Sequence, residues 1–411
     1  MGPLGAGCYP TCMSVALPGP RRSTLARSLL PIPFFLLLAA AVLLLDCGGP
    51  DQPDKTLAGS QEELTTTTTV RVHYPAFGHT VALRGDAAKL TWTRGVPLPS
   101  AGAGSDTFLF TTRALAKNTR LDFKPLLDDQ TWSKGPNYAV SAGGTVDVWP
   151  RFAQDQGAVT RIDQWWSNGL ADTRPVWIYT PPSYAEQSAE RFPVVYLHDG
   201  QNLFEAAWSF GGVTWPVAPT MDAGAADGTI REAIVVGIGN TANRMWEYTA
   251  SSDVDYPGGG AREYLTFVAV ELKGQIDRLY RTSPGRLDTG VVGSSLGGLA
   301  SAYAGLWRAD TFGLIGVMSP STWWNNQEVV SMVAAASTNP VQPARVYVDS
   351  GDSGPSSDDV TQTAALAAGY RKLPSVQVQY LVGHGDTHTE SSWARRLPGA
   401  LRFLLGARPA Q

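Results

Sequence analysis

Two adjacent serines lie between pairs of glycines in the stretch TGVVGSSLGG, residues 289–298. Only Ser295 stands at the centre of a G-x-S-x-G pattern, because Gly293 and Gly297 flank it at the required spacing. In that pattern the serine occupies a sharp turn between a strand and a helix, which exposes its hydroxyl for attack on a carbonyl carbon. Ser294 does not fit the pattern. The alternative interpretation is a glycine-rich turn without chemistry.

A serine hydroxyl is a weak nucleophile and needs a neighbouring base. In the α/β-hydrolase arrangement an acid and then a histidine follow the serine along the chain. Only His384 and His388 follow Ser295, and both lie in the segment LVGHGDTHTESSW after the last expected strand. Either of them could also be a solvated loop residue. The residue order alone therefore leaves both histidines as candidates.

The acid is expected after the strand RVYVD, residues 345–349. We prefer Asp352, in the turn SGDSG, because it could reach back and fix the tautomer of the histidine. Asp349, which ends the strand, is the second candidate. Asp358 and Asp359 are interpreted as ordinary carboxylates at the start of a helix, where the helix dipole favours them.

Two backbone N–H groups must stabilise the negative oxygen of the tetrahedral intermediate. The first is expected from Leu296, the residue after the serine. The second is expected from Gly200 or Gln201, where the chain leaves the strand in YLHDGQNLF. His198 in the same stretch precedes the serine, so we interpret it as structural.

The elements that would position these residues alternate between strand and helix. Strands are expected at residues 175–180, 193–198, 233–239, 290–293, 314–318, 345–349 and 376–382. Helices are expected at residues 262–280 and 296–307. One stripe of the first helix carries Leu265, Val268, Leu272, Ile276 and Leu279. This alternation predicts a doubly wound, mostly parallel sheet, with ligands at the carboxyl ends of its strands.

Residues 158–407 resemble the esterase family that includes enterochelin esterases, feruloyl esterases and the antigen 85 mycolyltransferases. The matching stretches include VYLHDGQNLF, VVGIGNTANRMWEY, VGSSLGGLASAY and HTESSWARRL. The resemblance implies an α/β-hydrolase fold, and it selects His388 as the base because this histidine stands five residues before Trp393. It also implies that Arg244 and Tyr248 bind the acyl or alcohol group of the substrate. Their alternative roles are a surface ion pair and a packing tyrosine.

Residues 70–155 have a different pattern, with short alternating strands separated by Gly and Pro, which predicts a small β-sandwich. The stretch resembles a starch-binding carbohydrate-binding module of the glucoamylase type. The resemblance rests on Trp92, Lys124, Trp132 and Asn137. It implies that the two tryptophans form a platform for glucose rings of an α-glucan, and that the polar residues bind sugar hydroxyls. The alternative is that both tryptophans are core residues.

The first 47 residues resemble an export signal. Three arginines precede the apolar stretch at residues 29–45, which is short for a membrane span and contains two prolines. The stretch ends in LLDCGG, which resembles a lipobox with Cys47 as the acylated residue, although Asp46 departs from the usual small residue. Residues 48–69 end in five threonines and are typical of a linker. We expect an exported protein that contacts a membrane only through its signal or lipid, and is otherwise periplasmic or secreted.

Composition limits the remaining functions. The 32 Lys and Arg against 36 Asp and Glu give a net charge of −4, so no basic field attracts nucleic acid. All three cysteines lie within the first 47 residues, and the five histidines lack metal-ligand spacing. We therefore expect no metal and no cofactor.

The sequence predicts an exported serine esterase that uses Ser295, His388 and Asp352. Acylated or feruloylated saccharides and siderophore esters are the expected substrates. The alternatives are an acyltransferase of the antigen 85 type and a catalytically silent, carbohydrate-binding surface lipoprotein.

Overall fold

The computed structural model describes residues 66–407, except 136 and 188–189. The expected signal segment, Cys47 and nearly all of the expected linker lie outside the described residues. Within the described part of the chain, no helix is both long and apolar enough to cross a bilayer.

The first part of the described chain forms two small β-sheets that enclose one core. One sheet contains β1 (Thr68–His73), β4 (Thr107–Thr112) and β8 (Thr145–Val148). The other contains β2 (Val81–Gly85), β3 (Val96–Pro97), β5 (Arg120–Leu127), β6 (Thr131–Trp132) and β7 (Tyr138–Ser141). Both sheets contribute to the core, which includes Val72, Phe110, Leu83 and Phe123. β1 begins two residues before the expected domain boundary, because Thr68 and Thr69 already pair with β4.

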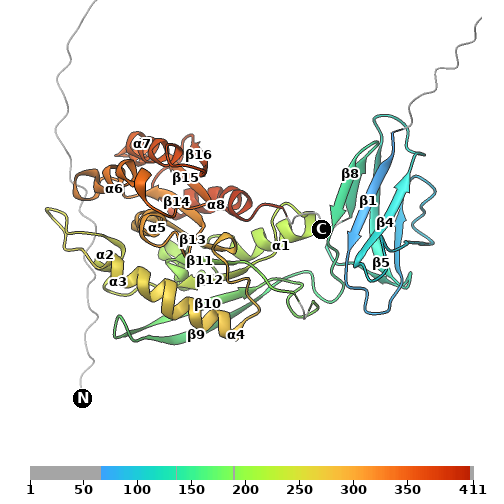
Figure 1. The fold of residues 1–411 in the computed structure, drawn as a ribbon, viewed down its shortest axis with the longest axis horizontal. Coiled ribbons are helices and arrows are strands. Elements are labelled where there is room, and N and C mark those ends of the chain that lie inside the picture. Colours follow the sequence, from blue (N-terminus) through green and yellow to red (C-terminus); the bar gives the residue numbers. More distant parts are fainter. Residues whose placement is uncertain (1–65, 136, 188–189, 408–411) are drawn as a thin grey trace, which may run out of the picture. The chain divides into compact units, whose positions relative to one another are not determined.

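The rest of the chain is built on an eight-stranded sheet with the order β16-β15-β14-β13-β11-β12-β10-β9 (Figure 1). The strands are β9 (Ala158–Ser167), β10 (Asp172–Thr180), β11 (Val194–His198), β12 (Ile234–Ile238), β13 (Thr289–Ser295), β14 (Leu314–Pro320), β15 (Arg345–Gly351) and β16 (Gln377–Gly383). All seven expected strands are present. The additional strand, β9, pairs with β10 as an antiparallel edge and is largely exposed, so it lacks the apolar pattern of a buried strand. The sheet is mostly parallel, as predicted.

Helices cover both faces of this sheet, as a doubly wound fold requires. The helices are α1 (Val217–Asp227), α2 (Arg244–Tyr248), α3 (Ala261–Thr266), α4 (Lys273–Leu279), α5 (Leu296–Trp307), α6 (Trp324–Ala335), α7 (Val360–Arg371) and α8 (Glu390–Leu405). Residues of α3, α5, α6 and α7 belong to one buried cluster, whereas α1 and α8 contribute to the other.

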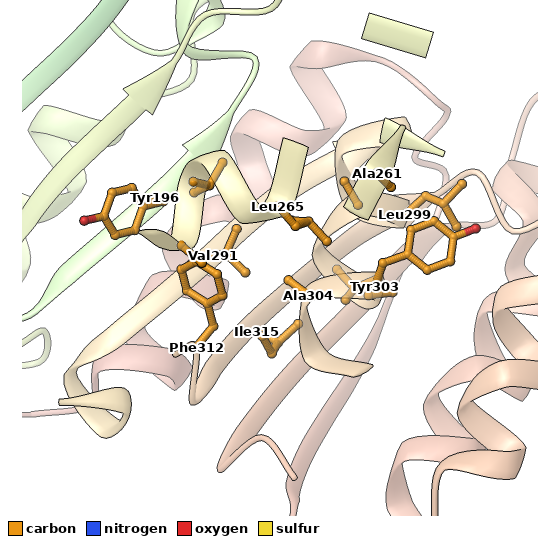
Figure 2. Packing of buried hydrophobic residues seen from close by; sticks show 14 of the residues in the cluster. Tyr196, Ala261, Leu265, Val291, Leu299, Tyr303, Ala304, Phe312 and Ile315 are labelled. Atoms are coloured by element: carbon orange, nitrogen blue, oxygen red, sulfur yellow. The ribbon is translucent and has the colours of Figure 1, made fainter. Parts of the chain in front are cut away.

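The larger cluster lies between the sheet and α3 and α5. Figure 2 shows members of this cluster, among them Val291 and Ile315 of the sheet, Leu299 of α5 and Leu265 of α3. The helix after Leu265 departs from the expected single stripe, because Leu279 is 64% exposed. A wide π-helical segment at Phe267–Leu272 joins α3 to α4, and it shifts the phase of the residues that follow it.

Replacing Leu299 by alanine should lower the free energy of unfolding by about 2–5 kcal/mol, because the side chain is fully buried and leaves a cavity. Leu279→Ala is the matched control on an exposed helical position and should change stability by less than about 0.5 kcal/mol. Urea unfolding followed by circular dichroism measures both values. Similar losses for the two variants would contradict this account of the core.

Candidate active site

Ser295 ends β13 and immediately precedes α5, on a strained turn. Its backbone has φ 57° and ψ −125°, which side-chain-bearing residues rarely adopt and which costs on the order of 1–3 kcal/mol. The flanking glycines are required by the close approach of strand and helix. A Cβ on Gly293 would lie 2.6 Å from the carbonyl carbon and oxygen of Gly297. The turn therefore has the geometry that the G-x-S-x-G pattern predicts.

His388 lies beside this serine, in the loop between β16 and α8. Its Nε2 is 2.9 Å from Ser295 Oγ, and its Nδ1 is 2.6 Å from Asp358 Oδ1. Because the carboxylate accepts a hydrogen bond from Nδ1–H, Nε2 carries no proton and can accept the proton of the serine. Trp393 packs edge-on against the imidazole, with ring centroids 4.9 Å apart, which accounts for the five-residue spacing. Serine, histidine and carboxylate thus form one continuous chain of hydrogen bonds.

The carboxylate in this chain differs from the expected one. Asp352 contacts His384 Nδ1 at 2.7 Å and the N–H of Gly385, so it does not orient His388. Asp358 is not an ordinary exposed carboxylate at a helix start, because its side chain is buried. Three consecutive residues, Ser357 to Asp359, have φ between 48° and 51°, and this left-handed turn directs Asp358 inward. Such a turn has no recognisable pattern in the amino-acid types.

Asp358 is held by donors on its second oxygen. Ser319 Oγ and the N–H of Gly351 both donate to Oδ2. Burial alone would raise the pKa of Asp358, but the hydrogen bonds from His388, Ser319 and Gly351 outweigh it and hold the pKa below its ordinary value. The carboxylate therefore stays ionised at neutral pH and can stabilise a protonated His388.

Asp349, the second expected acid, pairs with Arg396 rather than with His388. Its Oδ1 lies 3.2 Å from Arg396 Nη2, and the same guanidinium donates to Ser319 Oγ at 2.7 Å. Arg396 also pairs with Asp386. Asp349 therefore has a buried cation as its partner, and it reaches Asp358 only through Arg396 and Ser319.

The residues expected to provide the oxyanion donors lie at two adjacent strand ends. Leu296 is the first residue of α5, and the 3₁₀ turn Gly200–Asn202 follows β11, which pairs with β13. A Cβ on Gly297 would lie 3.1 Å from His198 Cβ and 3.3 Å from Asp199 Oδ2. The turn after β11 therefore packs directly on the start of α5.

Arg244 and Tyr248, the expected substrate-binding residues, both make hydrogen bonds with Asp199 in this turn. Arg244 makes two hydrogen bonds of 2.7 Å to the carboxylate of Asp199. Tyr248 is fully buried, and its hydroxyl accepts the N–H of Asp199 at 3.3 Å. An enclosed tyrosine cannot contact a substrate, so Tyr248 has the packing role of the alternative. Arg244 makes an ion pair, and its side chain is still 29% exposed.

His198, the last residue of β11, is buried against the rings of Tyr248 and Tyr264. Its Nδ1 lies 2.8 Å from the hydroxyl of Tyr264, and burial lowers its pKa to about 4. His198 is therefore neutral at physiological pH. Its buried contact with Tyr264 agrees with the structural role expected for a histidine that precedes the serine.

Ser321 and an aromatic pair next to it were not indicated by the sequence. The hydroxyl of Ser321 lies 3.3 Å from Ser295 Oγ, and its N–H donates to the carbonyl of Ser295. Two residues further on, the 44% exposed Trp323 makes an edge contact with Tyr256, which is equally exposed. The segment after β14 thus brings a hydroxyl to Ser295, and it carries an exposed aromatic ring two residues further on.

In the described part of the chain, no group of three or more His, Cys, Asp or Glu side chains is arranged to hold a metal ion. The hydrogen-bonded chain of serine, histidine and carboxylate can perform nucleophilic acyl chemistry with protein groups alone.

The four residues singled out in the β-sandwich lie near or at its surface. Trp92 and Trp132 are 37% and 39% exposed, with ring centroids 6.3 Å apart, so neither is a core residue. Asn137 is exposed as well. Lys124 donates to the carbonyl of Gly135, and partial burial lowers its pKa.

Comparison with known proteins places the matched region in the second part of the chain. A family model described as "Putative esterase" matches residues 167–404. The uncharacterized Bacillus subtilis protein YbbA is 30% identical over 167 residues, covering 39% of this chain and 62% of that protein. The endo-1,4-beta-xylanase/feruloyl esterase of Xylanibacter ruminicola is 26% identical over 247 residues, covering 58% of this chain and 30% of that protein.

The iron(III) enterobactin esterase of Escherichia coli is 28% identical over 204 residues, covering 48% of this chain and 46% of that protein. The chain thus spans less than two thirds of the length of each of these relatives. Among solved structures, an IroE-like serine hydrolase from Shewanella oneidensis has a TM-score of 0.51 at 24% identity, covering 61% of this chain and 80% of that one. This likeness shows the shared fold, which is of the α/β-hydrolase type.

Asp358→Asn should slow turnover of p-nitrophenyl acetate by about 10⁴, because an amide can donate to Nδ1 and stabilise the wrong imidazole tautomer. Asp352→Asn should keep most of the activity, because its partner is His384. Steady-state kinetics of the two variants, with circular dichroism to confirm folding, makes the comparison. A larger loss for Asp352→Asn would show that the loop rearranges in the working enzyme.

Proposed function

Because the chain belongs to the esterase family whose model matches residues 167–404, we propose that it is a serine hydrolase that cleaves carboxylic esters. The observation that carries the proposal is the chain of contacts from Ser295 Oγ to His388 Nε2, 2.9 Å, and from His388 Nδ1 to Asp358, 2.6 Å. Along the chain, the serine is followed by the carboxylate and then by the histidine, which is the order of the α/β-hydrolases once Asp358 takes the place of the acid.

The proposed reaction has two halves. His388 Nε2 removes the proton of Ser295 as Oγ attacks the ester carbonyl carbon, and the resulting oxyanion is stabilised by the N–H of Leu296 and an N–H of the Gly200–Gln201 segment. His388 then returns the proton to the departing alcohol, which leaves an acyl-enzyme. In the second half, water activated by His388 releases the acid. Asp358 stabilises the imidazolium throughout without taking its proton.

The proposed substrates are esters of saccharides, including feruloyl esters, or siderophore esters. Relatives with printed activities of both kinds support this range. The exposed aromatic surface of Trp323 and Tyr256, which begins two residues after Ser321, would suit an apolar or aromatic acyl group.

We further propose that the protein works outside the cytoplasm and that its β-sandwich binds an α-glucan. Export is supported by the basic and apolar pattern of residues 1–47, and anchoring by the lipobox-like stretch around Cys47. Membrane fractionation of the wild type and Cys47→Ser separates an anchored from a periplasmic or secreted protein. Glucan binding is supported by the adjacent, partly exposed rings of Trp92 and Trp132.

Ser295→Ala should lower turnover by about 10⁴ or more on every ester that the wild type hydrolyses, whereas Ser294→Ala should cost far less. Ser294 is buried and does not occupy the turn. The measurement is a hydrolysis screen with p-nitrophenyl acyl esters, feruloyl saccharides and enterobactin. Acyl transfer to an added alcohol in preference to water would change the reaction class, and an unaffected Ser295→Ala variant would end the proposal.

A double variant, Trp92→Ala with Trp132→Ala, should lose retention on insoluble starch while its melting temperature and its turnover of p-nitrophenyl acetate stay unchanged. Removing partly exposed rings takes away stacking surface without opening a core cavity. Trp166→Ala, which removes a 51% exposed tryptophan from β9, is the control and should be retained like the wild type. Failure of the wild type to bind any α-glucan would end the proposed link to starch.

A further inference from the structure

We propose that Asp199 and Arg244 are positioning residues for the oxyanion-stabilising turn, and that a second ion pair, Arg174 with Glu247, anchors the helix that carries Arg244. This inference rests on the proposed esterase function. Neither Asp199 nor Arg244 is assigned contact with the reacting atoms. Their role is to hold Gly200 and Gln201 where an N–H can reach the developing negative charge.

Asp199 is fastened through its backbone as well as its side chain. It has a left-handed backbone, φ 55° and ψ 48°, at the point where the chain leaves β11. Its N–H donates to the hydroxyl of Tyr248, and its carbonyl accepts the N–H of Asn202. Its carboxylate accepts two bonds from Arg244 and one of 2.6 Å from Asn240 Nδ2. An aspartate tolerates this conformation better than most residues, and the surrounding bonds select it.

The next two residues are held by contacts of their own. A Cβ on Gly200 would lie 2.5 Å from the carbonyl carbon of Gly237, so only glycine fits there without displacement of β12. The side-chain oxygen of Gln201 accepts the N–H of Asn240, and its backbone carbonyl accepts the hydroxyl of Ser209. Asp199 is thus the charged residue of this turn, whereas Gly200 and Gln201 are held by steric contact and by neutral hydrogen bonds.

Arg244 can hold Asp199 only if its own helix is fixed. α2 has five residues, which is too short for a helix to be stable by itself. Glu247, less than one turn after Arg244, is buried and makes bonds of 3.0 and 2.7 Å to the guanidinium of Arg174 on β10. Asp172 completes the set at 2.7 Å from the same guanidinium. Two ion pairs from one short helix therefore connect β10 to the turn after β11.

The charges in this arrangement are maintained at neutral pH. Burial alone would raise the pKa of Asp199, but Arg244 and Asn240 outweigh it and lower the pKa. Buried ion pairs add little net stability compared with apolar packing, because removing both charges from water is costly. What such a pair can provide is a fixed geometry, since a bidentate guanidinium and carboxylate meet in one plane.

The consequence is specific to the transition state. An N–H donor of this kind is needed when the carbonyl oxygen becomes negative, and much less when the neutral ester binds. Disturbing Asp199 or Arg244 should therefore lower kcat and leave KM nearly unchanged. Losing one oxyanion donor typically lowers kcat by about 10²–10³-fold. The Asp199 and Arg244 variants should lower kcat by no more than this, because they displace the donor and do not remove it.

The experiment compares Asp199→Asn, Arg244→Met and their combination with the wild type on p-nitrophenyl acetate. Both single variants should lower kcat by about 10-fold to 10³-fold with KM within a few-fold, and they should weaken binding of a trifluoromethyl ketone by a similar factor. This inhibitor forms a tetrahedral adduct whose oxyanion needs the same donors. The double variant should lose no more than the more severe single variant, because the two residues act as one unit. Arg244→Lys should restore part of kcat relative to Arg244→Met.

Asp288→Asn is the matched control. This substitution breaks the ion pair of Asp288 with Arg231. Asp288 lies just before β13, at the opposite end of that strand from Ser295. The kcat and inhibitor affinity of this variant should equal those of the wild type. Thermal melting of all variants separates lost positioning from lost folding, and Arg244→Lys provides the comparison if Arg244→Met does not fold.

Three results would overturn the inference: folded Asp199 and Arg244 variants with normal kcat, a loss of kcat without loss of inhibitor affinity, or a loss that follows the melting temperature alone. Failure of the proposed function is distinguishable from these. In that case the wild type itself would hydrolyse no ester, and Ser295→Ala would behave like the wild type.

Discussion

The close approach of α5 to the end of β13 is the constraint on which the site depends. Glycines at positions 293 and 297 allow this approach, and Ser295 between them is forced into a strained backbone conformation that exposes its hydroxyl. The same contact brings the turn after β11 against the start of α5. Strain of this kind persists only where the surroundings enforce it. The packing of the buried cluster shared by α5 and the sheet therefore maintains the strained backbone of Ser295.

Two sets of charged side chains lie around this turn. In one set, Arg396 contacts Ser319 and Asp349, and Ser319 in turn donates to the carboxylate of Asp358. In the other set, Arg244 binds Asp199, which directly precedes the Gly200–Gln201 segment. In both sets an arginine with several donors holds an acidic or hydroxyl group that would otherwise move. A reaction that develops charge at fixed points benefits from partners that do not need to reorganise.

The β-sandwich exposes aromatic side chains outside its core. Its core is enclosed between two small sheets, whereas Trp92 and Trp132 leave more than a third of their surface in solvent. Arg84 stacks against the ring of Trp132 and pairs with Asp129, so the exposed aromatic surface has a polar border. Exposed aromatic surface with polar groups around it suits a ligand that presents both apolar faces and hydroxyls, which is the chemistry of a sugar.

The sequence by itself determined the strands of the large sheet other than β9 and the turn at Ser295, because buried parallel strands are continuous apolar runs and a strand-to-helix turn of this kind requires glycines at fixed spacing. The sequence left His384 and His388 open in residue order, and only its resemblance to the esterase family selected His388. It did not identify Asp358, since Asp352 and Asp349 stood closer to the end of β15. Only the tertiary structure decided between the three carboxylates: a left-handed turn directs Asp358 to His388, while His384 and Arg396 bind the other two. It likewise placed Arg244 and Tyr248 against Asp199, because the partner of a side chain depends on which distant segments fold beside it.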